Sequence, residues 1–258
     1  MINEWDIAST NLHRARARLY EVAVLPVGAI EAHNRHLPLG TDFRCADHVA
    51  RAAAAAAWQR CPSVLCLPAL PYGVDCNLMA FPLTVTVKQA TLDAMIREIF
   101  SALRQHGLRK FVILNGHGGN DFLPFVRQVQ TELDIHIFVI DWWKVGADQY
   151  DQIFTQRDDH AGQFETSTAL ALFGQEVELA NAGDGAVRPF RFEALRQGWA
   201  YTSRDFGKMT TDCASGNPQG ASPDRGRQYL DICVSRIADF LVQVACAPID
   251  EFFPFQGP

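Results

Sequence analysis

Residues 110–120 read KFVILNGHGGN, an uninterrupted apolar run followed by a short segment rich in glycine. A continuous apolar run that ends in turn residues is typical of a buried strand in a parallel sheet. Three other runs have the same character, and they predict strands at 21–28 (EVAVLPVG), 63–70 (SVLCLPAL) and 135–141 (IHIFVID).

Segments of helical character separate these runs. Residues 43–60 contain an alanine-rich stretch, and in 88–106 the apolar residues recur at helical spacing. Further helices are predicted at 121–133, 165–173 and 224–244. The alternation predicts an α/β fold, with a mostly parallel sheet flanked by helices on both faces, in a single domain over residues 1–258. The irregular stretch 183–220 is expected to be an excursion that acts as a lid or an oligomer contact.

Composition excludes several classes of protein. The 258 residues are 48% hydrophobic, which is ordinary for a globular chain, and the net charge of −6 disfavours binding to nucleic acid or to an anionic membrane. No apolar run approaches the roughly 20 residues that span a bilayer, and 1–10 do not resemble a secretory signal. The seven cysteines include no C-x-x-C pair, which indicates free thiols in a reducing compartment. We therefore expect a cytoplasmic protein.

Polar side chains follow the predicted strands, at the edge where ligands gather in parallel α/β sheets. The first strand is followed by Glu31, His33, His36 and Asp42, the third by Asn115–Asn120 with His117, and the fourth by Asp141, Trp142 and Trp143. Carboxylates and imidazoles together suit Zn²⁺, Mn²⁺ or Fe²⁺, and this set exceeds the needs of one tetrahedral ion. The pattern therefore predicts a two-metal site with a bridging carboxylate.

Each of these residues also has a purely structural interpretation. A lone histidine is more often a core or surface residue than a ligand. Glu31 and Asp42 could be helix caps, and the glycine-rich segment could be a plain tight turn. The convergence of several such residues on one sheet edge favours the metal site.

Three ordered motifs resemble the signatures of the creatininase (creatinine amidohydrolase) family. They are Pro26-Val-Gly-Ala-Ile-Glu31-Ala-His33 continuing to His36-Leu-Pro-Leu-Gly-Thr-Asp42, then Asn115-Gly-His117-Gly-Gly-Asn120, then His160-Ala-Gly-Gln-Phe-Glu165-Thr-Ser167. Weaker similarities occur at 71–73 with 81–82 and at 216–218 with 221–222. The resemblance spans roughly residues 20–230.

The resemblance implies a Rossmann-like α/β domain with two divalent metal ions, within a homo-oligomer for which a hexamer is favoured. Zinc is the expected metal, with manganese or iron as alternatives. By position, Glu31 and His117 would hold one ion, His33 the other, and Asp42 both. Creatininase itself has a ligand Glu where this chain has Gly119. Relatives that share this glycine use the Glu of the third signature, so Glu165 is the expected fifth ligand. His160 is the expected acid/base or substrate contact, and Glu165 is also a catalytic candidate.

Several departures from the family pattern bear on substrate binding. Arg35 places a cation beside the predicted site, where it could meet an anionic substrate group or remain a solvated surface residue. His36 is expected in a pocket or supporting role, and Trp142 or Trp143 could stack on a flat substrate, with core packing as the alternative for at least one. Asn77-Leu78 and Leu83 also differ from many relatives.

The resemblance implies a metal-dependent amidohydrolase acting on a small-molecule substrate, a cyclic amide, a lactam or a formamide. The alternatives are a hydrolase of a cyclic polyol ketone or another carbohydrate-derived substrate on the same metal site, or a non-catalytic member of the family. The family also contains peptidase-like members. Creatinine itself is not the expected substrate, because Gly119 departs from the pattern of true creatininases.

Overall fold

Four parallel strands form the central sheet of the computed structural model, which describes residues 3–257. Their order is β2-β1-β3-β4, with bounds β1 (Val22–Val27), β2 (Val64–Cys66), β3 (Lys110–Asn115) and β4 (His136–Asp141). Every residue of β1 and β3 is buried, which explains why both strands are so apolar. In register, Val27 at the end of β1 lies beside Asn115 at the end of β3. The segments that follow these two strands therefore begin side by side.

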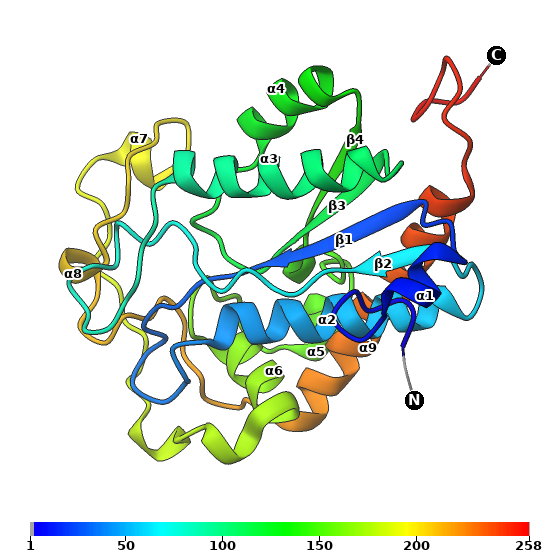
Figure 1. Ribbon diagram of the computed structural model, residues 1–258. Helices are drawn as coiled ribbons and strands as arrows, with labels where there is room; N and C mark the ends of the chain where they lie inside the picture. The colour runs from blue at the N-terminus through cyan, green and yellow to red at the C-terminus, as the bar shows by residue number, and fades with distance from the viewer. Residues whose placement is uncertain (1–2, 258) are drawn as a thin grey trace.

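Helices cover both faces of the sheet, as the sequence predicts (Figure 1). One face carries α3 (Gln89–Gln105) and α4 (Leu123–Leu133), and on this side Phe100 stacks on Phe111 with ring centroids 4.2 Å apart. The other face carries the following helices: α2 (Thr41–Trp58), α5 (Tyr150–Ile153), α6 (Gln163–Phe173) and α9 (Pro223–Cys246). The buried alanines of α2 let this helix lie close to the sheet and to α9.

The predicted second strand is shorter in the structure than in the sequence analysis. Regular pairing ends at Cys66, and Pro68 has no N–H to donate to β1. The backbone nevertheless continues alongside β1, because Leu70 N–H donates to the carbonyl of Pro26 at 3.0 Å. A short helix that the sequence analysis missed, α1 (Leu12–Arg16), precedes β1.

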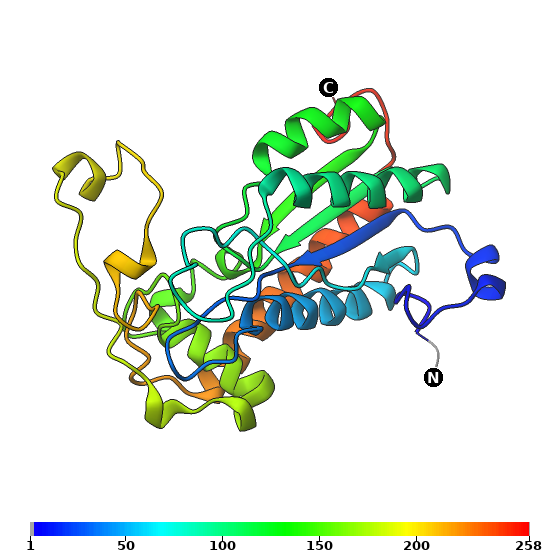
Figure 2. The same ribbon diagram turned by 60° about the vertical axis from the view of Figure 1, so that its left-hand side comes forward.

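The stretch 183–220 projects from the body of the molecule at the carboxyl edge of the sheet (yellow to orange in Figure 2). Its regular elements are α7 (Glu193–Arg196) and α8 (Phe206–Met209), and two 3-10 turns, η2 (Gly174–Glu176) and η3 (Leu179–Asn181), precede it. Asn34 ties it to the loop after β1, since its amide donates to the carbonyl of Gly183 and accepts from the N–H of Gly183.

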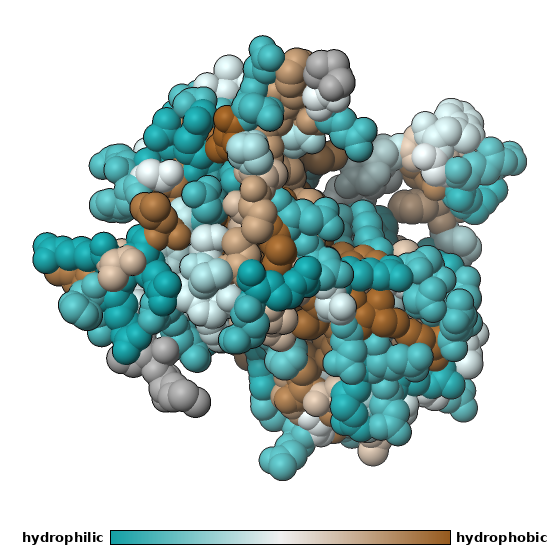
Figure 3. All heavy atoms as spheres, turned by 90° about the vertical axis from the view of Figure 1, so that its right-hand side faces the viewer, coloured by the Kyte–Doolittle hydropathy of each residue, from teal (hydrophilic) through white to brown (hydrophobic). Residues whose placement is uncertain are grey.

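The opposite end of the molecule, around the termini, is covered mainly by hydrophilic side chains with apolar patches between them (Figure 3). None of the helices in residues 3–257 is both long enough and apolar enough to span a membrane. All seven cysteines are unpaired, as the sequence predicts.

Candidate metal centre

Loops at the carboxyl edge of the sheet bring the predicted ligands together. Glu31 and His33 follow β1, Asp42 lies in the first turn of α2, and His117 follows β3. A carboxylate in the first turn of a helix is favoured by the helix dipole. Glu165 occupies the same kind of position in the first turn of α6. The fold thus concentrates carboxylates where two helix N-termini and two strand ends meet.

Six residues make three overlapping groups whose donor atoms lie within 4.8 Å of one another: Glu31, His33 and His160; Glu31, Asp42 and His117; His33, Asp42 and Glu165. Asp42 joins the last two groups. Its Oδ1 lies 2.9 Å from Nε2 of His33, and its Oδ2 lies 3.0 Å from Nδ1 of His117. This is the placement that a bridging carboxylate requires.

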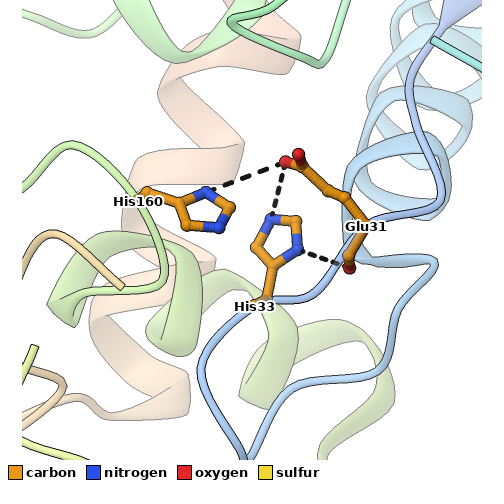
Figure 4. A group of neighbouring side chains, drawn as sticks. All are labelled: Glu31, His33 and His160. Carbon is orange, nitrogen blue, oxygen red and sulfur yellow. Dashed lines mark hydrogen bonds and ion pairs between the residues drawn. The ribbon is translucent and has the colours of Figure 1, made fainter. Parts of the chain in front are cut away.

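In each histidine a backbone carbonyl faces one ring nitrogen, and the other nitrogen faces the carboxylates of the cluster; Nε2 of His117 also lies 3.0 Å from Oδ1 of Asp75. Nδ1 of His33 lies 3.2 Å from the Glu31 carbonyl, and Nε2 of His160 lies 2.9 Å from the Ala32 carbonyl. Nε2 of His117 lies 3.2 Å from the Val74 carbonyl. A carbonyl partner of this kind fixes the tautomer and aims the free nitrogen. Figure 4 shows the free nitrogens of His33 and His160 facing the same Glu31 oxygen, at 3.8 and 3.7 Å.

Burial makes the charges of this cluster strongly interdependent. Desolvation raises the pKa of Glu31 to about 8 and that of Glu165 to about 7. Burial alone would lower the pKa of His33, but the neighbouring carboxylates, Asp42 above all, raise it to about 10. The pKa of His117 is also raised, because Glu31 and Asp42 outweigh its burial. The cluster therefore needs positive charge, which protons or divalent cations can provide.

The donor atoms fit divalent cations. Among the described residues, Nε2 of His33 and Oε2 of Glu31 are buried without a hydrogen-bond partner, although Asp42 Oδ1 lies 2.9 Å from that nitrogen. Buried polar atoms are normally paired, so unpaired ones that converge are an arrangement suited to a ligand. Mixed imidazole and carboxylate donors suit Zn²⁺, Mn²⁺ and Fe²⁺.

The surroundings of Glu165 and Gly119 determine which carboxylates can reach the cluster. The N–H of Ala161 donates to Oε2 of Glu165 at 2.5 Å, which holds this carboxylate 3.8 Å from Nε2 of His33. A Cβ at Gly119 would lie only 2.3 Å from Nε2 of His117 and from the carbonyl of Val74. A side chain at 119 is therefore incompatible with this arrangement of His117.

A cavity of about 470 Å³ opens over the cluster. Glu31, Asp42, His117, His160 and Glu165 all line it, and so does Trp143. The excursion forms part of its wall through Tyr201, Ser203, Arg204 and Phe206. The cavity can therefore hold a small organic molecule against the cluster.

Three candidate substrate contacts, Arg35, His36 and Trp142, are not among the residues that line this cavity. Arg35 is exposed and pairs with Asp212 at 3.3 Å. His36 is buried, and its Nε2 lies 2.8 Å from the Thr166 hydroxyl. Trp142 is buried against Phe164 with ring centroids 5.4 Å apart, so core packing accounts for it. Together with Asp42 and Glu165 it lines a small void of about 10 Å³.

The sequence analysis missed two carboxylates near the cluster, the buried Asp75 and the half-buried Asp158. Asp75 follows β2, so the rule that polar residues gather after strands would have found it had it been applied to that strand. Asp158 accepts from the Tyr150 hydroxyl at 2.7 Å and from the Phe164 N–H at 2.8 Å, which fixes the loop that carries His160. No motif or periodicity in the sequence analysis marked the residues of 183–220 that line the cavity.

Comparison with known proteins gives a consistent result. The family model of creatinine amidohydrolase matches residues 6–241. The creatinine amidohydrolase of Pseudomonas putida is 28% identical over 239 residues, covering 84% of this chain and 87% of that protein. The mycofactocin precursor peptide peptidase of Mycobacterium ulcerans is 29% identical over 225 residues, covering 83% of this chain and 84% of that protein.

Solved structures share the fold. The crystal structure of a protein described as a putative creatinine amidohydrolase of Bacteroides fragilis superposes with a TM-score of 0.88 at 34% identity, covering 97% of this chain and all of that chain. A manganese form of creatininase superposes with a TM-score of 0.77 at 25% identity, covering 95% of this chain and all of that chain.

Proposed function

Because this chain belongs to the creatininase family of metal-dependent amidohydrolases, we propose that it hydrolyses the C–N bond of a small amide with two divalent metal ions. Zinc is the expected metal, with manganese or iron as alternatives. One observation carries this proposal: one oxygen of Asp42 lies 2.9 Å from Nε2 of His33 and the other lies 3.0 Å from Nδ1 of His117. A carboxylate placed between two imidazoles in this way suits a pair of cations.

The ligand assignment follows from the overlapping groups. Glu31 and His117 would hold one ion, and His33 and Glu165 the other, with Asp42 between them. Two divalent cations held by these residues would lower the pKa of a water molecule and polarise an amide carbonyl. The buried walls of the cluster strengthen these electrostatic effects, because little solvent is present to screen them.

His160 is the proposed proton carrier. Its Nε2 faces the Ala32 carbonyl, so Nδ1 keeps its lone pair and faces Glu31 at 3.7 Å. Burial, followed by the nearby His33, lowers the pKa of His160 to about 3, so the ring is neutral and a weak base. It would hold the proton of the attacking water only briefly. That proton would then pass to the amine nitrogen as the C–N bond breaks. Glu165, at the other side of His33, would assist the same transfer.

The cavity favours a substrate larger than a simple lactam. Its volume of about 470 Å³ lies within the range of sites that hold drug-sized molecules. The amide bond of a short peptide is therefore a second candidate, supported by the similarity to a peptide peptidase. A flat cyclic amide could instead stack on the half-buried Trp143, which lines the cavity.

A substrate panel tests the proposed reaction. Protein loaded with Zn²⁺ or Mn²⁺ is incubated with lactams, formamides, short peptides and a cyclic polyol ketone, and amine release is followed together with product mass. We expect turnover of at least one amide, abolished by chelation and restored by metal. Turnover of the polyol ketone alone would contradict the assignment to amides. Asp224→Asn, on the exposed first turn of α9, is the control variant and should match the unmodified protein.

A further inference from the structure

Asp75 is the most unusual residue near the metal centre. Its side chain is completely buried, and among the described residues neither carboxylate oxygen has a hydrogen-bond partner. An unpaired buried carboxylate is costly, so its presence needs a compensating interaction. The nearest cationic group is the imidazole of His117, whose Nε2 lies 3.0 Å from Oδ1 of Asp75.

His117 differs from the other histidines of the cluster in what lies behind it. The outer nitrogens of His33 and His160 meet only a backbone carbonyl. The outer nitrogen of His117 meets the Val74 carbonyl at 3.2 Å and also the carboxylate of the next residue, Asp75. A carboxylate behind a ligating imidazole holds the proton on the outer nitrogen and increases the basicity of the inner one.

Gly119 is the reason that this arrangement is possible. A Cβ at this position would lie 2.3 Å from both Nε2 of His117 and the Val74 carbonyl. A side chain at 119 and the close approach of Val74 and Asp75 to His117 therefore exclude each other. Gly119 therefore leaves room for Val74 and Asp75 to lie behind His117.

The charges of the centre support the same conclusion. The proposed ligands Glu31, Asp42 and Glu165 carry three negative charges, one fewer than the positive charges of two divalent cations. Asp75 brings the number of carboxylates at the centre to four. The balance between carboxylate charges and cation charges has a larger effect on free energy in a site of low dielectric than in water.

We propose that Asp75 is a positioning residue of the metal centre: its buried carboxylate stands behind His117, made possible by Gly119, and adds a fourth negative charge to those of the proposed ligands. The role of Asp75 rests on the proposed function, because it presumes that His117 is a ligand.

The dissociation constant for Zn²⁺, measured by competition with a chromophoric chelator, tests this role. Asp75→Asn keeps the shape and removes the charge, whereas Asp75→Ala removes both. We expect both variants to bind the Zn²⁺ ion assigned to Glu31 and His117 about 10- to 100-fold less tightly than the unmodified protein. If Asp75→Ala fails to fold, Asp75→Asn alone decides the question. Dissociation constants within twofold of the unmodified value would overturn the role.

Asp6→Asn is the matched control, because Asp6 is also a buried carboxylate but pairs with Arg51, nine residues beyond Asp42 on α2. It should leave zinc affinity unchanged. Thermal unfolding gives a second readout. A merely structural residue would lower the unfolding temperature equally with and without Zn²⁺, whereas loss of Asp75 should reduce the increase that Zn²⁺ produces. An unchanged increase would contradict the role. If the unmodified protein itself binds no Zn²⁺, the proposed function fails, and not only the role of Asp75.

Discussion

Oδ1 of Asp42 lies 2.9 Å from Nε2 of His33, yet the nitrogen is left without a hydrogen bond among the described residues. The two atoms are close but are not aimed at each other, as expected of two ligands that face a common point. Because the second oxygen of Asp42 faces His117 at 3.0 Å, this carboxylate links two histidines that follow different strands. Several consequences of this arrangement can be measured.

Asp42→Ala should remove both metal ions, because Asp42 is shared by both proposed ligand groups. Metal content per chain, measured by elemental mass spectrometry, should fall to near zero. Asp47→Ala, five residues later on α2 and outside the cluster, serves as the control. Retention of two ions by the Asp42 variant would show that this carboxylate does not bridge.

Glu165→Gln should weaken the binding of one metal ion and slow turnover, because the amide keeps the shape of the carboxylate but not its charge. We expect one tightly bound ion per chain and a decrease in kcat of about 100-fold or more. Glu176→Gln, at an exposed carboxylate shortly after α6, should change neither quantity. If metal content and rate both survive in the Glu165 variant, this residue is not the fifth ligand.

His160→Ala should lower kcat by about 100- to 10,000-fold and leave the metals bound. The reason is that His160 is proposed to carry a proton, although its Nδ1 also lies within reach of Glu31 and His33. Steady-state kinetics and metal content are measured on the same preparation. Loss of a metal ion would make His160 a ligand instead.

Gly119→Glu should weaken metal binding, even though it restores the carboxylate present in creatininase. The new Cβ would displace either His117 or the Val74 carbonyl, each of which it would approach to 2.3 Å. Zinc affinity is the measurement, with Gly118→Ala as control because the space beside Gly118 is open. Tighter binding in the Gly119 variant would mean that this loop can rearrange to accept a ligand.

Asp6→Asn should destabilise the fold without affecting the metal centre. Burial alone would raise the pKa of Asp6, but hydrogen bonds from Arg51, Ser9 and the Ala8 backbone lower it overall. The ionised form therefore stabilises the fold above pH 4, and this contribution is lost as the pH falls through the lowered pKa. We expect a loss of about 1–2 kcal/mol at pH 7 and a smaller one at pH 3, measured by urea unfolding. An equal loss at both values would assign the effect to packing.

Much of the fold could be predicted from the sequence, because buried parallel strands leave a clear apolar signal. The runs at 22–27 and 110–115 are buried throughout, and each is followed by polar residues that the structure places at one edge. The convergence of Glu31, His33, Asp42 and His117 follows from that topology. Glu165 and His160 lie on α6 and on the loop before it, and the order of the strands does not predict that these segments reach the site. Only the third family motif pointed to these two residues.

Other features could not be predicted, because they depend on packing between segments distant in sequence. Trp142 and Trp143 are neighbours after β4, yet one lies in the core and the other lines the cavity. Arg35 lies beside a predicted ligand, but its side chain is on the surface with Asp212. Asp75 acquires its significance only from the approach of the segment after β2 to His117, which a sequence pattern does not show.

The most direct test of the central claim is the metal content per chain of protein purified without chelators and without a histidine-rich tag. Elemental mass spectrometry should find close to two transition-metal ions per chain, or two after incubation with Zn²⁺ or Mn²⁺. A protein that binds no metal under any of these conditions would contradict the dinuclear centre and leave a non-catalytic family member as the better account.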